Sequence, residues 1–342
     1  MMKWLFDELG AITGGQLLAL LCLYAAVVLA LAAIGAAVRA VLSPASQTIR
    51  GAHVVITGGS EGIGFAIGAE AARQGANVTI LSRSVNKLEK AAAKLKADAP
   101  SALDQRILFV SCDVTDAAIA RDAIRKAADT APIDFLVCAA GAAYPGYFLQ
   151  QDVSVFEKSM RLNYLGTVFV VKAAAEAMVA RGSGTIVALS SGAAAASFLG
   201  YSSYAPTKFA VRGFMDAIRN ELLGTGVRCS IAYPPDTDTP GFEKENTTKP
   251  PECQRISPPE VHSASTVAQL ILSGAADGVY HLPSPDLVQN QLIYSTAGIT
   301  PTPGSSAVLM ALSPLLTVAG RLFGCWADHV ARGYGASLRK NM

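Results

Sequence analysis

From residue 52 onward, short runs of apolar and β-branched residues alternate with longer stretches whose apolar residues recur at helical spacing. The short runs predict strands, and stretches such as 63–73 and 85–99 predict helices. This alternation is typical of an α/β fold with a Rossmann-like, doubly wound parallel sheet. The expected strands are 53–57, 77–82, 107–112, 135–139, 185–190, 228–233 and 279–282.

An apolar stretch near the start of the chain lies outside this alternation. Residues 17–42 carry no charge before Arg39 and exceed the ~20 residues needed to cross a hydrocarbon core. A cleaved signal peptide is the alternative, but its apolar part is only about 7–15 residues long, so a retained N-terminal transmembrane anchor is favoured. Arg39 and Arg50 follow the span, whereas two acids offset the one lysine before it. By the positive-inside rule, the main domain is expected to face the cytosol.

Two later stretches also break the pattern. Residues 234–259 are rich in proline, threonine and charge, which predicts a loop, or a mobile lid over a ligand. Residues 305–326 are apolar with one charge, and fit a second span, a hairpin dipping into the membrane or an interfacial helix. We therefore expect a membrane anchor at 1–45, an α/β domain at 50–285 with its substrate loop at 234–262, and a membrane-associated segment at 286–342.

Composition narrows the function classes. Apolar residues make up 51% of the 342 residues and charged residues only 16%, with the apolar surplus at the two ends, which indicates membrane contact. A net charge of +2 without basic runs argues against nucleic-acid binding. Six scattered cysteines without a CxxC pair predict neither disulfides nor a metal site, and favour a reducing compartment.

The first expected strand runs directly into the turn TGGSEGIG, which contains Gly58, Ser60, Glu61, Gly62 and Gly64. The first glycine permits a tight turn, the second lets a pyrophosphate approach the backbone, and the third lets the helix pack closely. Free amides at the helix start favour phosphate. A purely structural turn is the alternative, but a position between the first strand and the first helix favours dinucleotide binding.

The second strand ends beside Arg83, with Lys87 a helical turn beyond. An NAD-dependent enzyme usually carries a carboxylate here, whereas an arginine can hold the 2′-phosphate of NADPH in bidentate fashion. A solvated arginine is the alternative, and we favour NADPH. After the third strand, Asp113 is placed either to bond the adenine amine or to cap the next turn.

The segment Tyr204-Ala-Pro-Thr-Lys208 follows a serine pair, Ser190 and Ser191, at the end of a strand. A free tyrosine has a pKa of ~10, and an ammonium one helical turn away is expected to lower that pKa toward a useful value. Ser191 would hold a carbonyl oxygen while Tyr204 donates its proton, and Lys208 would also bond the nicotinamide ribose. A surface tyrosine and lysine are the alternative for YxxxK alone; the serines and the glycine turn in this order favour catalysis.

These residues together resemble the short-chain dehydrogenase/reductase family over residues 52–282. The resemblance implies that Asn163 bends a helix and holds a proton-relay water, that Asp113 contacts the adenine, and that Ser191, with Ser190 in reserve, is the catalytic serine. It also implies pairing of two copies through the fourth and fifth helices. In place of the family's Asn-Ala-Gly stands Cys138-Ala-Ala-Gly, which cannot make the asparagine's hydrogen bonds and puts local sheet stability in doubt.

Within that family the stretch YPPDTDTPGF at 233–242, the TGGSxGIG turn and the apolar N-terminal span are similar to 3-ketodihydrosphingosine reductases. This resemblance implies an endoplasmic-reticulum membrane enzyme with a cytosolic active site that uses NADPH to reduce a long-chain lipid ketone. Asp236 or Asp238 would either receive the substrate's ammonium group or cap turns in the loop. The alternatives are a reductase of a steroid, retinoid or fatty-acyl ketone, and an inactive NADP-binding scaffold.

Overall fold

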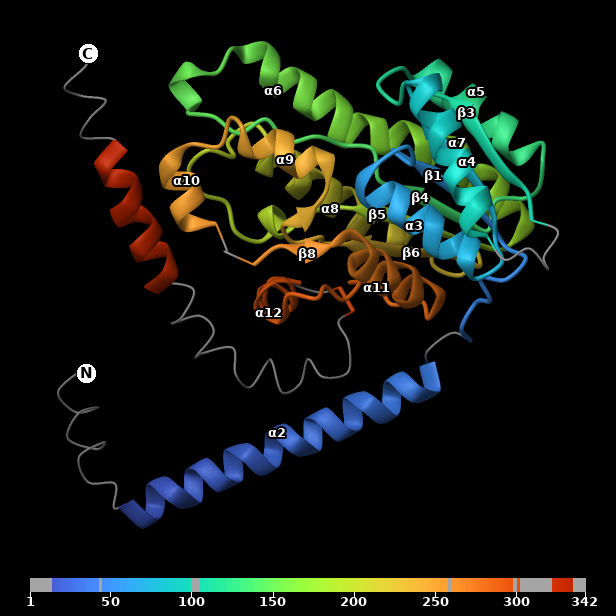
Figure 1. The fold of residues 1–342 in the computed structure, drawn as a ribbon. Helices are drawn as coiled ribbons and strands as arrows, with labels where there is room; N and C mark the ends of the chain where they lie inside the picture. Colours follow the sequence, from blue (N-terminus) through green and yellow to red (C-terminus); the bar gives the residue numbers. More distant parts are fainter. Residues whose placement is uncertain are drawn as a thin grey trace.

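The computed structural model describes residues 14–42, 45–99, 105–257, 260–297, 300–301 and 322–334. Six strands form one parallel sheet in the order β3-β2-β1-β4-β5-β6, which confirms the Rossmann-like expectation. The strands, drawn in Figure 1, are β1 (His53–Thr57), β2 (Asn77–Ser82), β3 (Ile107–Ser111), β4 (Phe135–Cys138), β5 (Gly184–Leu189) and β6 (Val227–Ala232).

Helices cover both faces of this sheet. β1 shows why, since Val54 and Ile56 face one buried apolar cluster while Val55 between them faces the other. The first cluster lies beneath α3 (Gly62–Arg73), α4 (Val85–Asp98) and α11 (Ala264–Ala276). The second lies beneath α5 (Ala117–Ala128), α7 (Gly166–Arg181) and α8 (Ala205–Glu221).

The strand order reverses between β1 and β4. β1 connects outward to β2, whereas β4 connects to β5 on the opposite side, and Thr57 pairs with Cys138 where the two strands end. In an open α/β sheet the crevice at this reversal, at the carboxyl ends of the strands, is where ligands bind. The fold therefore assigns the site to the segments that follow β1, β4, β5 and β6.

The prediction of a seventh strand at 279–282 is wrong. Only a single parallel bridge forms, between Ile231 and His281, with two hydrogen bonds that join Ile231 to Tyr280 and Leu282. The segment leaves the edge of β6 after this one pairing, and the His281 ring bonds instead to the hydroxyls of Tyr233 and Thr300. An apolar run bounded by glycine and proline does not by itself specify how many residues pair.

The stretch expected as a loop at 234–259 contains short elements instead. They are β7 (Thr237–Asp238), α9 (Pro240–Asn246) and α10 (Pro251–Ile256), and β7 pairs with β8 (His262–Ser263). Thr239 caps α9 by accepting from the amide of Phe242, and a proline opens each helix at a position that needs no donor. We call residues 234–257 the lid segment; residues 258–259 lie outside the described part of the chain.

The residues of α6 (Val153–Ser159), the π-helix η2 (Met160–Leu165) and α7 run on without a break. By length and composition, this helix, Val153–Arg181, could cross a membrane. However, 44% of its apolar window is buried within the protein, and Val170, Val171 and Met178 are in the second core cluster. It is therefore a core helix of the domain.

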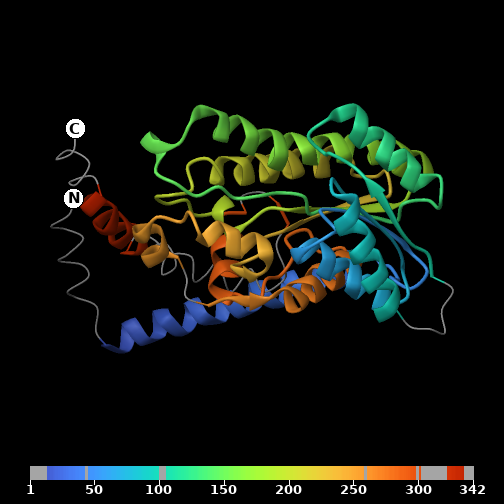
Figure 2. The same cartoon turned by 45° about the horizontal axis from the view of Figure 1, so that its top comes forward.

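The predicted N-terminal span is one helix, α2 (Gly14–Leu42). It extends as a straight rod outside the layers of the domain, as two views show (Figure 1 and Figure 2). Its 29 residues reach about 43 Å at 1.5 Å per residue, more than the ~30 Å of a hydrocarbon core. Leu18, Leu23 and Leu29 are exposed along it.

Among the residues described after the sheet domain, two segments are helical. α12 (Leu287–Ser295) packs through Ile293 into the second core cluster, and the helix at 322–334 packs through Ala327 and Val330 against Ile256 of α10. Figure 2 shows this last helix beside α10. Most of the apolar stretch 305–326 lies outside the described residues, so its relation to a membrane stays a prediction.

Candidate active site

The turn after β1 has the close geometry that its glycines predict. Gly58 has φ +69°, and a Cβ there would lie 2.8 Å from the amide nitrogen of Ala140. A Cβ on Gly64 would lie 2.4 Å from the carbonyl oxygen of Gly58, so α3 packs directly on the turn. Gly62, with φ +61°, is the first residue of α3, and the start of this helix, with its unpaired amides, lines the cleft.

The residues expected around the 2′-phosphate lie close together at the ends of β1 and β2. Arg83 is exposed and lines the cleft, and Ser60 donates to Ser82 over 3.0 Å. Lys87 binds Glu61, with 2.7 Å between Nζ and the carboxylate. A phosphate bound to Lys87 would have to compete with Glu61, which leaves Arg83 as the better-placed cation.

Asp113 makes the turn-capping contact that was one of its two predicted roles, and adenine contact stays a prediction. Its Oδ1 caps the following turn, accepting from the amide and hydroxyl of Thr115 at 3.0 and 2.8 Å. These bonds, with the charges of Arg83 and Arg161, outweigh burial and lower its pKa. The residue also lines the cleft, so capping does not exclude adenine contact.

A single cleft of about 1100 Å³ connects these groups to Tyr204 and the lid segment. The half of the cleft that lies at the ends of β1 and β2 fits a dinucleotide. A tight glycine turn, a helix N-terminus for the pyrophosphate and an arginine at the end of β2 follow one another there along the carboxyl edge of the sheet. The residues present are therefore compatible with a nicotinamide cofactor.

Tyr204 and Lys208 lie at the start of α8. Tyr204 is the N-cap residue, and Lys208 follows one turn later with Nζ 5.5 Å from the centre of the tyrosine ring. The ammonium donates to the carbonyl oxygen of Leu189, at 2.9 Å, at the end of β5. Burial lowers the pKa of Lys208 to about 8.

The expectation that Lys208 lowers the pKa of Tyr204 does not hold in this structure. Burial raises the pKa of Tyr204 well above its usual value of 10, and the carboxylates of Glu245 and Asp236 raise it further; a hydrogen bond with Ser191 works against them. The lysine is directed to a backbone carbonyl, so burial dominates. Tyr204 is therefore fully protonated at neutral pH, the state that a proton donor requires.

The two adjacent serines have different surroundings. Ser190 is buried and donates to the carbonyl oxygen of Lys208 at 3.0 Å, which ties β5 to α8. Ser191 lies on the cleft, hydrogen-bonds with Tyr204 and caps the short turn η3 (Gly192–Ala194). The geometry favours Ser191 over Ser190 as the hydroxyl that reaches a substrate.

Asn163 lies in the π-helix η2 and is buried. Its Oδ1 accepts from the amide of Ala142 at 2.9 Å, and its Nδ2 donates to the carbonyl of Ala142 and to Thr207 Oγ1 at 3.0 and 3.1 Å. A Cβ on Gly141 would lie 3.0 Å from Asn163 Oδ1 and 3.6 Å from Lys208 Nζ. A π-helical turn, common at functional sites, thus brings the asparagine close to the lysine.

Cys138 ends β4 within an intact ladder, paired with Thr57 on one side and Ala188 on the other. Burial raises the pKa of its thiol to about 12, so the side chain behaves as a small apolar group. The sheet is therefore continuous although Cys138 cannot make the hydrogen bonds of the family's asparagine. The amide of Ala140 donates to Thr57 Oγ1 at 3.3 Å.

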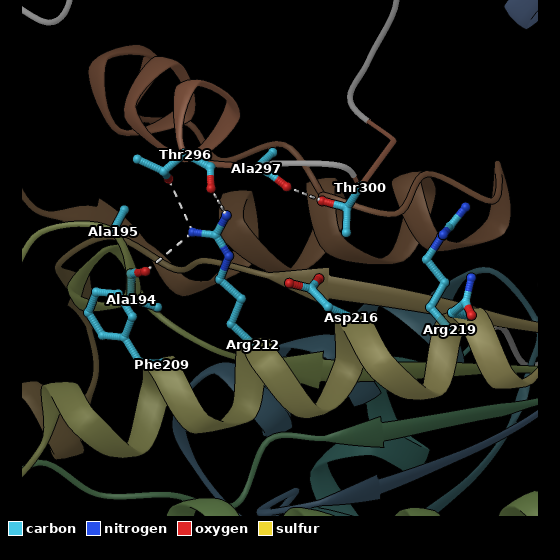
Figure 3. Close-up of a pocket in the computed structure, with 10 residues that line it drawn as sticks. Ala194, Ala195, Phe209, Arg212, Asp216, Arg219, Thr296, Ala297 and Thr300 are labelled. Atoms are coloured by element: carbon cyan, nitrogen blue, oxygen red, sulfur yellow. Dashed lines mark hydrogen bonds between the residues drawn. The ribbon is translucent and has the colours of Figure 1, made fainter.

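A smaller hollow of about 600 Å³ lies behind the turn that follows Ser191, and its walls are shown in Figure 3. Arg212 of α8 crosses it and donates to the carbonyl oxygen of Ala194 at 3.3 Å, to Thr296 Oγ1 at 3.1 Å and to the Thr296 carbonyl oxygen. Arg212 therefore holds the serine turn and the end of α12 in place relative to α8.

The lid segment brings charged residues to Tyr204, and of these the sequence singled out only Asp236 and Asp238. Asp236 lines the cleft, whereas Asp238 is exposed. Glu245 of α9 and Tyr201 also line it, and Lys249 is buried behind them. No sequence signal pointed to Glu245, because only the folding of the lid segment places Glu245 of α9 beside Tyr201.

Comparison with known proteins identifies the chain's relatives. The family described as short chain dehydrogenase matches residues 52–250. A 3-ketodihydrosphingosine reductase of Bos taurus is 40% identical over 248 residues, 71% of this chain and 74% of that protein. One of Dictyostelium discoideum is 36% identical over 74% of this chain and 80% of that protein, and a 3-dehydrosphinganine reductase of Danio rerio is 38% identical over 69% and 72%.

Solved structures show the same architecture. A short-chain type dehydrogenase/reductase from Mycobacterium ulcerans superposes with a TM-score of 0.63 at 27% identity, covering 78% of this chain and 95% of that one. A short chain dehydrogenase/reductase family protein superposes with a TM-score of 0.58 at 31% identity, covering 70% and 97%.

Proposed function

From the premise that this chain belongs to the short-chain dehydrogenase family, we propose that it reduces 3-ketodihydrosphingosine to dihydrosphingosine with NADPH, in sphingolipid biosynthesis. The observation that carries the proposal is the cleft in which Ser191, Tyr204 and Lys208 lie between a dinucleotide-shaped half and a lid. The relatives named for this reaction, at up to 40% identity, support the substrate.

In the proposed reaction Tyr204 is the acid. Its raised pKa keeps the phenol protonated, so it can donate to the ketone oxygen as negative charge develops there. Ser191, which bonds to Tyr204, holds the same oxygen from the β5 side. The bound nicotinamide supplies the hydride to the carbonyl carbon.

The phenolate formed in this step has to recover a proton. The ammonium of Lys208 lies 5.5 Å from the centre of the ring, and its lowered pKa of about 8 makes it a suitable proton source near neutral pH. Asn163 lies beside Gly141, close to Lys208, and three hydrogen bonds fix its side chain. We infer that Asn163 and Lys208 together hold the path by which Tyr204 is reprotonated.

Arg83 is proposed to select NADPH. Reversing its charge with Arg83→Glu should lower kcat/KM for NADPH about 100-fold, because a charge-assisted contact with the 2′-phosphate becomes a repulsion. With NADH kcat/KM should stay level or rise. Steady-state kinetics with both cofactors measure this, and Lys90→Glu, an equal reversal at an exposed site on α4, is the matched control. An unchanged NADPH/NADH preference would show that Arg83 does not bind the phosphate.

The half of the cleft that lies beyond Tyr204, toward α10 and α12, suits a long alkyl chain. Apolar side chains from α10, α12, the loop after η3 and the C-terminal helix line it, namely Phe198, Ile256, Val288, Leu292 and Phe323. Val288 and Phe323 are both exposed as well, so the apolar wall continues to the surface. A lipid tail could leave the cleft by this route while its ketone stays beside Tyr204.

The direct test is NADPH consumption by the full chain in detergent with 3-ketodihydrosphingosine, beside steroid, retinoid and simple fatty ketones. We expect the sphingoid ketone to have the highest kcat/KM. Preference for one of the other ketones would reassign the substrate while leaving the chemistry intact. NADPH binding without turnover of any ketone would instead favour an inactive cofactor-binding scaffold.

We further propose that α2 anchors the enzyme in the endoplasmic-reticulum membrane with the catalytic domain in the cytosol. The apolar side chains exposed along α2 and the apolar mouth of the cleft support this, since a long-chain ketone is concentrated in the bilayer. Pairing of two copies stays a prediction.

Charges placed on α2 should weaken the anchor. In the double variant Leu23→Lys, Val27→Lys, each lysine near the centre of a span costs about 2.5–3.5 kcal/mol on insertion, so a larger fraction should be extracted by alkaline carbonate. Quantitative blotting of membrane pellets measures it, and Ile119→Lys, on an exposed apolar residue of α5, should remain in the pellet. Equal retention of all three proteins would contradict an anchoring role for α2.

A further inference from the structure

A compact set of charged groups forms one wall of the cleft beside Tyr204. Glu245 accepts from the Tyr201 hydroxyl, and its Oε1 lies 3.5 Å from Lys249 Nζ. The same ammonium lies 3.9 Å from Asp236 Oδ2. The side chain of Lys249 is only 2% exposed and is held over the rings of Tyr201 and Phe242, at 5.8 and 4.9 Å from their centres.

The charges in this set do not balance. Two carboxylates, Asp236 and Glu245, share one buried ammonium, and burial with the nearby charge of Glu245 raises the pKa of Asp236. The imidazole of His262 is also close enough to act on Asp236, and Lys244 lines the cleft as an exposed side chain. A second cation entering the cleft would complete the pairing.

Acceptor atoms are also left over. The Tyr201 hydroxyl and Lys249 both contact Oε1 of Glu245, and Lys249 approaches Asp236 only at Oδ2. Within the described part of the chain, neither Oε2 of Glu245 nor Oδ1 of Asp236 accepts a hydrogen bond. Both carboxylates line the cleft, so solvent or a ligand can reach these oxygens.

The proposed substrate restricts where such a ligand group can lie. In 3-ketodihydrosphingosine the amine is on the carbon next to the ketone, so it must lie beside the oxygen that receives the proton of Tyr204. The rings of Tyr201 and Tyr204 are 5.9 Å apart, and the charges of Glu245 and Asp236 both act on Tyr204. The carboxylates thus lie near Tyr204 on the wall of the same cleft, within the region where the amine of an α-amino ketone has to lie.

We propose that Glu245, assisted by Asp236, binds the ammonium group of the α-amino ketone and so selects sphingoid ketones over ketones without the amine. This rests on the proposed function. Lys249 partly neutralises the two carboxylates when the site is empty, and Tyr201 orients the Glu245 carboxylate through its hydroxyl. Asp238, which is exposed, takes no part.

The same contacts could instead serve only to hold the lid segment, since Glu245 and Lys249 are one turn apart. The two roles differ in what a substitution changes. A purely structural pair would affect every ketone alike, whereas an ammonium site affects only ketones that carry the amine.

The test compares kcat/KM for 3-ketodihydrosphingosine and for the same ketone without its amine, using the full chain with NADPH. The parent should prefer the amino ketone. Glu245→Gln should lower kcat/KM for the amino ketone by about 10- to 100-fold, as expected for loss of a hydrogen-bonded charge pair, and leave the amine-free ketone nearly unchanged. Glu245→Asp, which keeps the charge, should restore part of the preference.

Controls separate folding from recognition. Glu243→Gln, an exposed residue of the same helix, and Asp238→Asn should behave as the parent on both ketones. If thermal melting shows that Glu245→Gln does not fold, Asp236→Asn replaces it in the test. Asp236→Asn should likewise reduce the preference for the amino ketone over the amine-free ketone.

Each outcome has a distinct meaning. Equal kcat/KM of the parent on the two ketones overturns the ammonium site while ketone reduction stands. An equal loss on both ketones in folded Glu245→Gln also overturns it and assigns the pair to lid structure. Failure of the parent to reduce either ketone counts against the proposed function itself.

Discussion

Replacing Tyr204 with phenylalanine should lower kcat for ketone reduction about 1,000-fold while leaving the Kd for NADPH close to that of the parent. The phenol is the only acid proposed to reach the ketone oxygen, and positioned acids contribute about 10²–10⁴-fold. The ring and its packing beside Tyr201 are kept, so the loss reports on the hydroxyl. Single-turnover NADPH oxidation measures the rate, and quenching of protein fluorescence measures cofactor binding.

Tyr164→Phe is the matched control for this prediction. Its ring packs edge-on against Phe214 at 6.3 Å, one residue from Asn163, and no step of the proposed reaction uses its hydroxyl. The control should retain activity near that of the parent. Turnover by Tyr204→Phe at the parent rate would remove the tyrosine from the mechanism, whichever ketone is used.

Lys208→Met should lower kcat about 100-fold or more, because it removes the ammonium that lies 5.5 Å from the tyrosine ring and the proposed contact with the nicotinamide ribose. The substitution keeps the length of a buried side chain. It removes one hydrogen bond to Leu189 but also a buried charge, so the thermal midpoint should change little. Lys172→Met, at an exposed position on α7, should leave both quantities unchanged.

The lowered pKa of Lys208 adds a pH signature to this prediction. Reduction by the parent should decline as the pH rises through about 8, where the ammonium loses its proton. The stability of the parent should change in the opposite direction and rise with pH. The pKa of the lysine is 10.5 in the unfolded chain and about 8 in the folded protein, so the free energy of unfolding is lowered by the buried charge below pH 8 and recovers between pH 8 and 10.5. The parent should therefore gain stability relative to Lys208→Met over that interval, and an interval without such a change would contradict the lowered pKa.

Much of the domain could be predicted because its signals are local. The bounds of β1 and β2 match the predicted runs residue for residue, and the order glycine turn, serine pair, YxxxK was sufficient to indicate the family. Strand–helix alternation needs only neighbouring residues, and the turn at Gly58 and Gly64 needs residues without a Cβ.

The errors came from properties that depend on distant residues. The run at 279–282 looked like a strand, but pairing with β6 stops after one residue, which no local pattern reveals. The lid segment looked like a loop because its short helices begin at prolines and follow charged, polar residues.

The sequence by itself determined the type of fold, the order of the glycine-turn, serine and YxxxK motifs, and the position of the proposed proton donor, because each is encoded within a few neighbouring residues. Only the tertiary structure decided the direction in which the pKa of Tyr204 moves and which acids stand beside it. Burial and Coulomb interactions act through space, so residues such as Asp236, Glu245 and Lys249 acquire their role only when the lid segment folds beside Tyr201.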